Sequence, residues 1–377
     1  MKVLCAALLA GTTAMTAPVY AEDAKPAGLN PDDVKKVLGL SIYLQGGYTY
    51  NANATDISAA QGQENDLRVF DHKANSIGLD LAQLVFLKDA TAGAAGYKLK
   101  LSAGETAKWI HSRGLSGAPL TSAQAGEGTD SLDVTEAYMS YIAPAGKGVR
   151  FDLGKMVTYH GAEVIEAKDN VNYSRSLLFN YAIPFTHTGL KVSYSFTDTL
   201  SASAHIVNGW DNSTDNNKAK TYGLSIGYAP AELISGYVNL MTGPEQDNIN
   251  GNKRTLVDVV ATIKPMKQLS LILNYDDAKE DIPGSSVSWS GFSGIVKYDF
   301  SDMYSLSVRA ESFDDKDGVR TGVAQKLTEV TVTPEIRLNG GLILRPEYRH
   351  DSSDQSSFNN ATKKSQDTIA LGMMYTW

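Results

Sequence analysis

Asp367-Thr-Ile-Ala-Leu-Gly-Met-Met-Tyr-Thr-Trp377 is the stretch that decides the fold class of this chain. Side chains alternate between the two faces of a β-strand. One face of this stretch is therefore apolar and the other is small and polar; the apolar face carries Ile369, Leu371, Met373, Tyr375 and Trp377. A closing strand of a membrane barrel has this pattern, with an apolar face toward lipid and an aromatic residue at the interface. The last strand of a soluble β-sandwich can have it too, so the rest of the chain must decide.

The same alternation recurs along the chain and predicts sixteen strands. We expect them at residues 41–50, 74–87, 95–104, 132–142, 148–157, 188–196, 199–210, 220–228, 233–242, 254–263, 268–276, 287–300, 304–313, 326–338, 342–350 and 367–377. Most of these segments are near ten residues long, which is the length that a tilted strand needs to cross a membrane. Bacterial barrels also have an even number of strands.

The links between the expected strands alternate in length. Short links are expected at 88–94, 143–147, 197–198, 229–232, 264–267, 301–303 and 339–341, and long links at 51–73, 105–131, 158–187, 211–219, 243–253, 277–286, 314–325 and 351–366. If the first strand rises from the periplasm, every short link is periplasmic and every long link is extracellular. A soluble sandwich has no reason to sort its loops in this way. We therefore predict an all-β fold, a transmembrane antiparallel β-barrel of about 16 strands with short periplasmic turns and long extracellular loops.

The first forty residues have a different composition. Lys2, the mostly apolar or small residues 3–16 and Val19-Tyr20-Ala21 predict a secretory signal peptide over residues 1–21. Residues 22–40 then form a periplasmic lead-in, with a short helix predicted near 30–39, and the barrel takes residues 41–377. The one cysteine, Cys5, lies in the signal peptide, so we expect no disulfide in the mature chain.

Composition excludes several classes of function. A formal net charge of −8 disfavours nucleic-acid binding. Nothing in the sequence pairs the six histidines with a nucleophile or a second catalytic group, and no His/Cys cluster has metal-ligand spacing. We therefore expect no enzymatic activity, no cofactor and no metal.

Charged residues at inward positions of the strands are the candidate functional residues, because charges on a lipid-facing side would be costly. The predicted pore-lining residues are Lys98, Lys100, Arg150, Lys191, Lys297, Arg309, Glu311, Glu335, Arg337, Arg345, Glu347 and Arg349. They could set a field across a pore, or they could form a solvated ladder of ion pairs that keeps the lumen polar. Both interpretations require water inside the barrel.

The longest charged link with apolar residues of its own is 158–187. It holds Glu163, Glu166, Asp169 and Arg175, together with an apolar patch around Leu177. A long loop with such a patch can pack inside a wide barrel, so we predict that it forms the constriction of the pore. The alternative is a loop packed on the rim or against a partner subunit.

Five short motifs resemble a known family. They are Phe151-Asp-Leu-Gly-Lys155, Gly161-Ala-Glu163, Asn172-Tyr-Ser-Arg-Ser-Leu-Leu-Phe179, Pro184-Phe-Thr-His-Thr-Gly-Leu190 and Val207-Asn-Gly-Trp-Asp211. As a set they resemble the β-barrel porin-2, OmpL-like, family of Gram-negative outer-membrane porins. The resemblance implies a porin-like barrel over most of the mature chain, without catalytic or ligand residues to transfer. Trp377 departs from the terminal Phe that is most typical of such barrels.

The sequence thus predicts a porin of the bacterial outer membrane for passive diffusion of small hydrophilic solutes or ions through a water-filled lumen. Its expected partners are outer-membrane lipid, the solutes and further copies of itself in a homo-oligomer. Two alternatives remain. One is a substrate-selective channel for anionic solutes that uses Arg309, Arg337, Arg345 and Arg349, and the other is a non-conducting structural or adhesion barrel.

Overall fold

A computed structural model describes residues 31–53, 64–115 and 131–377. The chain divides into residues 1–37 and residues 38–377, and each part is described by itself. Helix α2 spans Pro31–Leu38. No helix among the described residues is long and apolar enough to cross a membrane.

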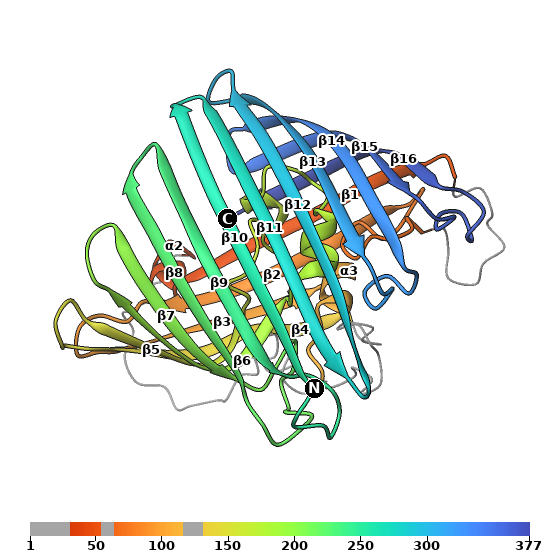
Figure 1. The fold of residues 1–377 in the computed structure, drawn as a ribbon. Coiled ribbons are helices and arrows are strands. Elements are labelled where there is room, and N and C mark those ends of the chain that lie inside the picture. Colours follow the sequence, from red (N-terminus) through yellow and green to blue (C-terminus); the bar gives the residue numbers. More distant parts are fainter. Residues whose placement is uncertain (1–30, 54–63, 116–130) are drawn as a thin grey trace, which may run out of the picture. The chain divides into compact units, whose positions relative to one another are not determined.

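The second part is a closed antiparallel barrel of sixteen strands (Figure 1). The strands are β1 (Leu40–Asn51), β2 (Ile77–Lys88), β3 (Ala95–Ala103), β4 (Leu132–Ala143), β5 (Val149–Val157), β6 (Thr186–Ser195), β7 (Leu200–Val207), β8 (Thr221–Ala231), β9 (Ile234–Pro244), β10 (Lys253–Met266), β11 (Leu269–Ile282), β12 (Ser285–Asp299), β13 (Tyr304–Asp315), β14 (Gln325–Leu338), β15 (Leu342–Ser353) and β16 (Ser365–Thr376). Each predicted strand has its counterpart among them, so the predicted fold class is confirmed.

The first and last strands close the ring. Tyr43 of β1 lies opposite Thr376 of β16, and the register continues to Asn51 opposite Thr368. Ile42 and the terminal Trp377 also exchange two backbone hydrogen bonds of 2.9 and 3.0 Å. Closure gives every edge strand a partner, which removes the unpaired backbone groups that lipid cannot satisfy.

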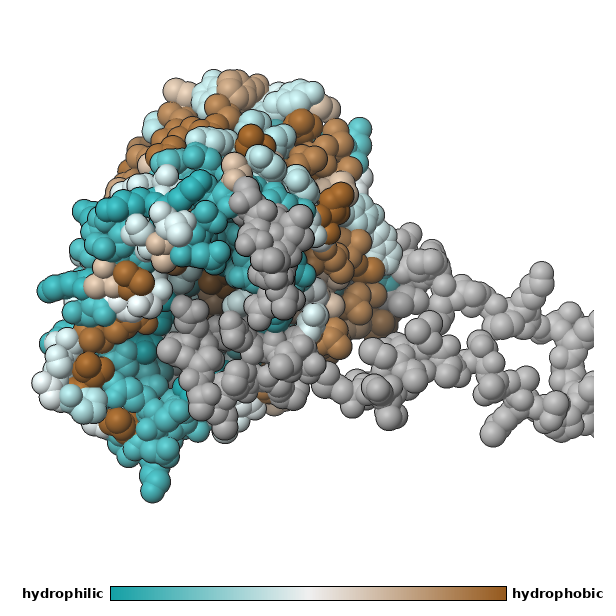
Figure 2. Space-filling view, turned by 90° about the vertical axis from the view of Figure 1, so that its right-hand side faces the viewer, coloured by the Kyte–Doolittle hydropathy of each residue, from teal (hydrophilic) through white to brown (hydrophobic). Residues whose placement is uncertain are grey.

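The two faces of the strands differ as the alternation predicts. On β16, Ile369, Leu371 and Met373 are 50–60% exposed, whereas Ala370 and Met374 on the inner face are buried. Figure 2 shows hydrophobic residues gathered on the flank of the molecule, beside a mainly hydrophilic area that faces the viewer. The outer face therefore suits lipid contact.

One predicted link is wrong. Residues 277–286 were expected to form a long loop, but β11 runs to Ile282 and β12 starts at Ser285, so only two residues join them. Gly284 has φ of 79°, a conformation that favours glycine in a tight turn. The charged residues Asp277, Lys279 and Asp281 alternate outward along the continuing strand. The polar residues on the outer face therefore indicate that the environment of the strand changes from apolar to polar here. They do not indicate the end of the strand.

The link from β5 to β6, residues 158–185, lies inside the ring of strands, and we call it the inner loop (Figure 1). It contains a 3-10 turn, η1 (Ala167–Asp169), and a π-helical turn, η2 (Leu178–Ala182). A short helix, α3 (Glu105–Trp109), follows β3. The buried apolar cluster combines ten inner-loop residues with fifteen residues from other parts of the chain, which include inward side chains of the wall such as Trp289 and Phe313.

Candidate functional site

The inner loop is held by carboxylates of the barrel wall. Glu347 of β15 accepts hydrogen bonds from the backbone N–H groups of Tyr173 at 2.7 Å and Ser174 at 3.0 Å. Glu311 of β13 accepts in the same way from Leu177 at 2.6 Å and Leu178 at 3.2 Å. A buried backbone donor without a partner is costly, so these two carboxylates satisfy donors that the irregular loop cannot satisfy by itself.

Three arginines of the same wall donate hydrogen bonds to backbone carbonyl groups of the loop. Arg309 pairs with Glu163 of the loop at 2.8 Å and donates to the carbonyl of Ser174 at 2.9 Å. Arg345 donates to the carbonyls of Ala167, Asn170 and Asn172. Arg349 donates to the carbonyl of Arg175 at 2.6 Å. A planar guanidinium has several donors in fixed directions, which suits a cluster of loop carbonyls.

These contacts correct the expectation for the arginine wall. Arg309, Arg345 and Arg349 are no more than 2% exposed, and Glu311, Glu335 and Glu347 no more than 6%. The alternation places all six inward as predicted; the inner loop contacts five of them, whereas Glu335 pairs with Arg345 and Arg337. These buried side chains therefore do not face a water-filled lumen: five of them bind the loop, and Glu335 holds Arg345 in place.

The other predicted pore residues fall into two groups. Lys297 and Arg337 lie near the short links and pair with Asp299 at 3.1 and 3.0 Å. Lys100 is buried and bridges Glu136 of β4 at 2.8 Å and Glu166 of the loop at 2.6 Å. These three residues are likewise engaged by neighbours. The second group, Lys98, Arg150 and Lys191, lines a cavity that is described below, and two of its members, Lys98 and Arg150, also form ion pairs.

The four predicted constriction residues have different surroundings. Glu163, Glu166 and Arg175 are buried, and Asp169 is exposed and pairs with Lys168. Burial alone would raise the pKa of Glu166, but the Lys100 ammonium and its hydrogen bond lower that pKa to about 2. Arg175 lies within the loop, where it donates to the carbonyl of Val164 at 3.2 Å. Three of the four thus fix the loop, and their part in narrowing a pore stays a prediction.

The loop also reaches the closing strand. The ring of Tyr173 lies on Gly372 of β16, where an added Cβ would come within 2.2 Å of the ring. The Tyr173 hydroxyl donates to Asp80 of β2 at 2.6 Å. Gly372 and its register partner Gly47 therefore leave the space that this side chain occupies.

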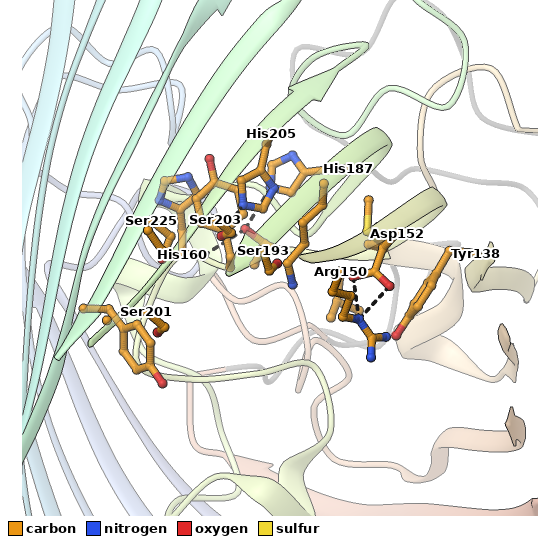
Figure 3. A pocket seen from close by; sticks show the side chains of 18 of the residues that line it. Tyr138, Arg150, Asp152, His160, His187, Ser193, Ser201, Ser203, His205 and Ser225 are labelled. Atoms are coloured by element: carbon orange, nitrogen blue, oxygen red, sulfur yellow. Dashed lines mark hydrogen bonds and ion pairs between the residues drawn. The ribbon is translucent and has the colours of Figure 1, made fainter. Parts of the chain in front are cut away.

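A cavity of about 780 Å³ remains on the side of the barrel away from these contacts. It extends from residues near the short links, such as Lys147 and Tyr194, to His160 and Glu163 of the inner loop. Its charged lining residues are Lys98, Lys147, Arg150, Lys191, Glu136, Asp152 and Glu163, and hydroxyls line it at Ser193, Ser195, Ser201, Ser203 and Ser225. Figure 3 shows Arg150 and Asp152 on one side of this space and the serines and histidines on the other. The other cavities reported among the described residues measure only about 40 and 20 Å³.

Histidines at the end of the cavity were missed by sequence reasoning. The Tyr159 ring stacks on His205 with 3.9 Å between ring centroids, and it lies 4.2 Å from His160. His187 bonds the Thr158 hydroxyl through Nε2 at 3.1 Å. These residues come from three elements and share no sequence motif, so no local signal could have grouped them. Within the described ranges, no three His, Cys, Asp or Glu side chains are placed to hold a metal ion.

Solved structures with a similar fold are outer-membrane barrels. Salmonella typhi OmpF in complex with daunomycin matches with a TM-score of 0.61 and 12% identity over 90% of this chain and 97% of that one. An anion-selective porin from Comamonas acidovorans matches with 0.58 and 11% over 90% and 98%. The trimer form of Vibrio cholerae OmpT matches with 0.55 and 13% over 90% and 98%. At such low identity the likeness shows the fold alone.

No curated protein matches the sequence. The family model described as "Putative beta-barrel porin-2, OmpL-like" matches residues 38–377, which is the whole barrel with its closing strand. This match supports a porin-like outer-membrane barrel. The chain belongs to the putative beta-barrel porin-2, OmpL-like, family.

Proposed function

We propose that this protein is a porin that lets small hydrophilic solutes diffuse passively across the outer membrane. The observation that carries the proposal is the cavity of about 780 Å³ beside the inner loop, with its charged and hydroxylated lining. Such a lining favours water and polar solutes over lipid chains. In this proposal the solute passes between the inner loop and the wall formed by β3 to β9, and the loop is the constriction.

Three further expectations belong to this proposal. Residues 1–21 direct export and residues 22–40 lie in the periplasm; residues 1–30 are outside the described ranges. The apolar outer face contacts outer-membrane lipid, in agreement with the exposed side chains of β16. The protein forms a homo-oligomer, for which the trimer form of Vibrio cholerae OmpT is the supporting precedent among similar folds.

Single-channel conductance of the refolded protein in a planar bilayer tests the proposal. Discrete current steps are expected, because a water-filled path of fixed width carries a fixed current. Swelling of liposomes in sugars of increasing size then measures the cut-off for uncharged solutes. Folding is checked by resistance to unfolding in detergent without heating. Folded protein that gives neither current steps nor liposome swelling would contradict the porin proposal and favour a closed structural barrel.

A further inference from the structure

Every charged side chain that lines the cavity forms an ion pair among the described residues, except Lys191. Lys98 pairs with Glu136 at 2.7 Å, Lys147 with Asp198 at 2.7 Å and Arg150 with Asp152 at 2.9 Å. Glu163, the cavity carboxylate on the inner loop, pairs with Arg309. Lys191 of β6 lines the same cavity and makes no ion pair within 4.0 Å with any residue in the described part of the chain.

The nearest carboxylate in the strand register is already engaged. Asp152 of β5 lies directly opposite Lys191. Both of its oxygens accept from Nε of Arg150, at 2.9 and 3.0 Å, and one also accepts from the Ser140 hydroxyl at 2.5 Å. On the other side, the register partner of Lys191 is His205 of β7, whose Nε2 is hydrogen-bonded to the Ser203 hydroxyl at 2.9 Å. Neither neighbour forms an ion pair within 4.0 Å with the Lys191 ammonium.

The Arg150 guanidinium is a second hydrogen-bond donor group close to Lys191. Arg150 uses Nε for Asp152 and Nη2 for Ser140, and among the described residues its Nη1 has no hydrogen bond. Arg150 is the register partner of Ser193, two residues along β6 from Lys191. Diagonal neighbours of this kind lie roughly 7–8 Å apart, with their Cβ atoms somewhat closer. Both side chains are long and line the same cavity, so their charged ends can contact one small anion together.

The geometry points to an oxyanion-binding subsite at Lys191 and Arg150 on the β5–β6 wall, which takes carboxylate or phosphate groups of solutes in transit. This inference rests on the proposed porin function and names the solute class that the pore favours. A cation without a counter-ion in a partly desolvated cavity attracts an anion more strongly than a paired one, and an oxyanion can accept from the ammonium and the guanidinium together. The serine hydroxyls beside the subsite suit the hydroxyl groups of such solutes.

The test uses planar-bilayer currents carried by chloride, with inorganic phosphate or gluconate added as the competing oxyanion. Both are expected to reduce the wild-type current in a saturable way, and the stronger of the two shows whether the subsite prefers phosphate or carboxylate. Lys191→Met is expected to weaken the block by about tenfold, because one charge-assisted contact is lost. Lys191→Arg is expected to retain it.

Lys297→Met is the matched control, since Lys297 also points inward but pairs with Asp299 and does not line the cavity. It removes the same charge and should leave the block within about twofold of wild type. Lys191→Gln serves as a second neutral variant if the methionine variant does not fold. Wild-type channels that conduct without saturable block, or an equal loss of block in the Lys297 variant, would overturn the subsite alone. Absence of any current in folded wild-type protein would instead refute the porin proposal.

Discussion

Arg345→Met is the substitution that tests most directly whether the inner loop narrows the pore. Methionine keeps much of the length of the side chain and removes the guanidinium. In the structure that group donates to three loop carbonyls, including Asn172 at 2.9 Å, and pairs with Glu335 at 2.7 Å. The substitution therefore releases the segment around η1 without changing the loop's own sequence.

The expected magnitude follows from these contacts. Each hydrogen bond to a charged group contributes about 1.5–3 kcal/mol, and the carbonyls left behind are buried. Breaking a buried ion pair by removing one partner costs about 3–5 kcal/mol. Since Glu335 keeps Arg337 as a second partner, we expect a loss near the lower limit, about 3 kcal/mol, in the free energy that docks this segment. That loss raises the undocked fraction of the segment roughly a hundredfold.

Single-channel conductance is the assay, and Arg337→Met is its control. Both arginines pair with Glu335, but the hydrogen bonds of Arg337 go to Asp299, Ser305 and the carbonyl of Asp302, none of which belongs to the inner loop. Arg345→Met should give larger or more variable current steps, whereas Arg337→Met should match wild type. Equal steps in both folded variants and in wild type would refute the constriction role of the loop.

Three further predictions concern stability and pH. Asp276→Asn should raise the free energy of unfolding by about 1–3 kcal/mol in urea titration, because the buried Asp276 and Asp258 carboxyl groups face each other and an uncharged amide can donate to Asp258 without a second acidic group at the site; a lower urea midpoint would contradict this. The pKa of Glu166 is about 2 against an ordinary value of 4.5, so its pairing with Lys100 stabilises the docked loop fully above about pH 4.5 and is lost as the pH falls toward 2; in a comparison of wild type with Lys100→Met, the difference in current steps should be constant from about pH 5 to 8 and shrink only in strong acid. Leu371→Arg, on the exposed face of β16, should cost about 2–4 kcal/mol in unfolding from lipid vesicles, and no change would argue against a lipid-facing position.

The barrel could be predicted from the sequence because its determinants are local. The alternation of Ile369, Leu371 and Met373 with smaller residues is visible within one strand, and the geometry of a strand converts it into two faces. The error at residues 277–286 has the same origin. Outward charges such as Lys279 end an apolar pattern, but they do not end the backbone pairing, which continues to Ile282 opposite Ser285.

The state of the inward charges could not be predicted, because it depends on contacts between distant segments. Glu311 is 134 residues from Leu177, whose N–H it binds, and Arg345 is 175 residues from Asn170. The strand period places these side chains inward and gives no information on whether water or a loop meets them. The apolar patch around Leu177 indicated that the loop could pack inside, but it could not indicate which wall the loop would cover.

The inner loop buries some inward charges of the barrel and leaves others in contact with the cavity. Only the second kind can act directly on a solute in the cavity. The loop covers β13 to β15, where the arginines are most numerous, and their charges are neutralised by Glu163, Glu329 and Glu335. A buried cation with hydrogen-bonded counter-ions contributes little field at a distance. In the proposed porin, selectivity then depends on the one charged cavity group of the opposite wall that makes no ion pair among the described residues, and neither the net charge of the chain nor a count of inward residues predicts it. On this argument Lys191, outside the dense arginine region, has more influence on the permeating ion than Arg309, Arg345 and Arg349 together.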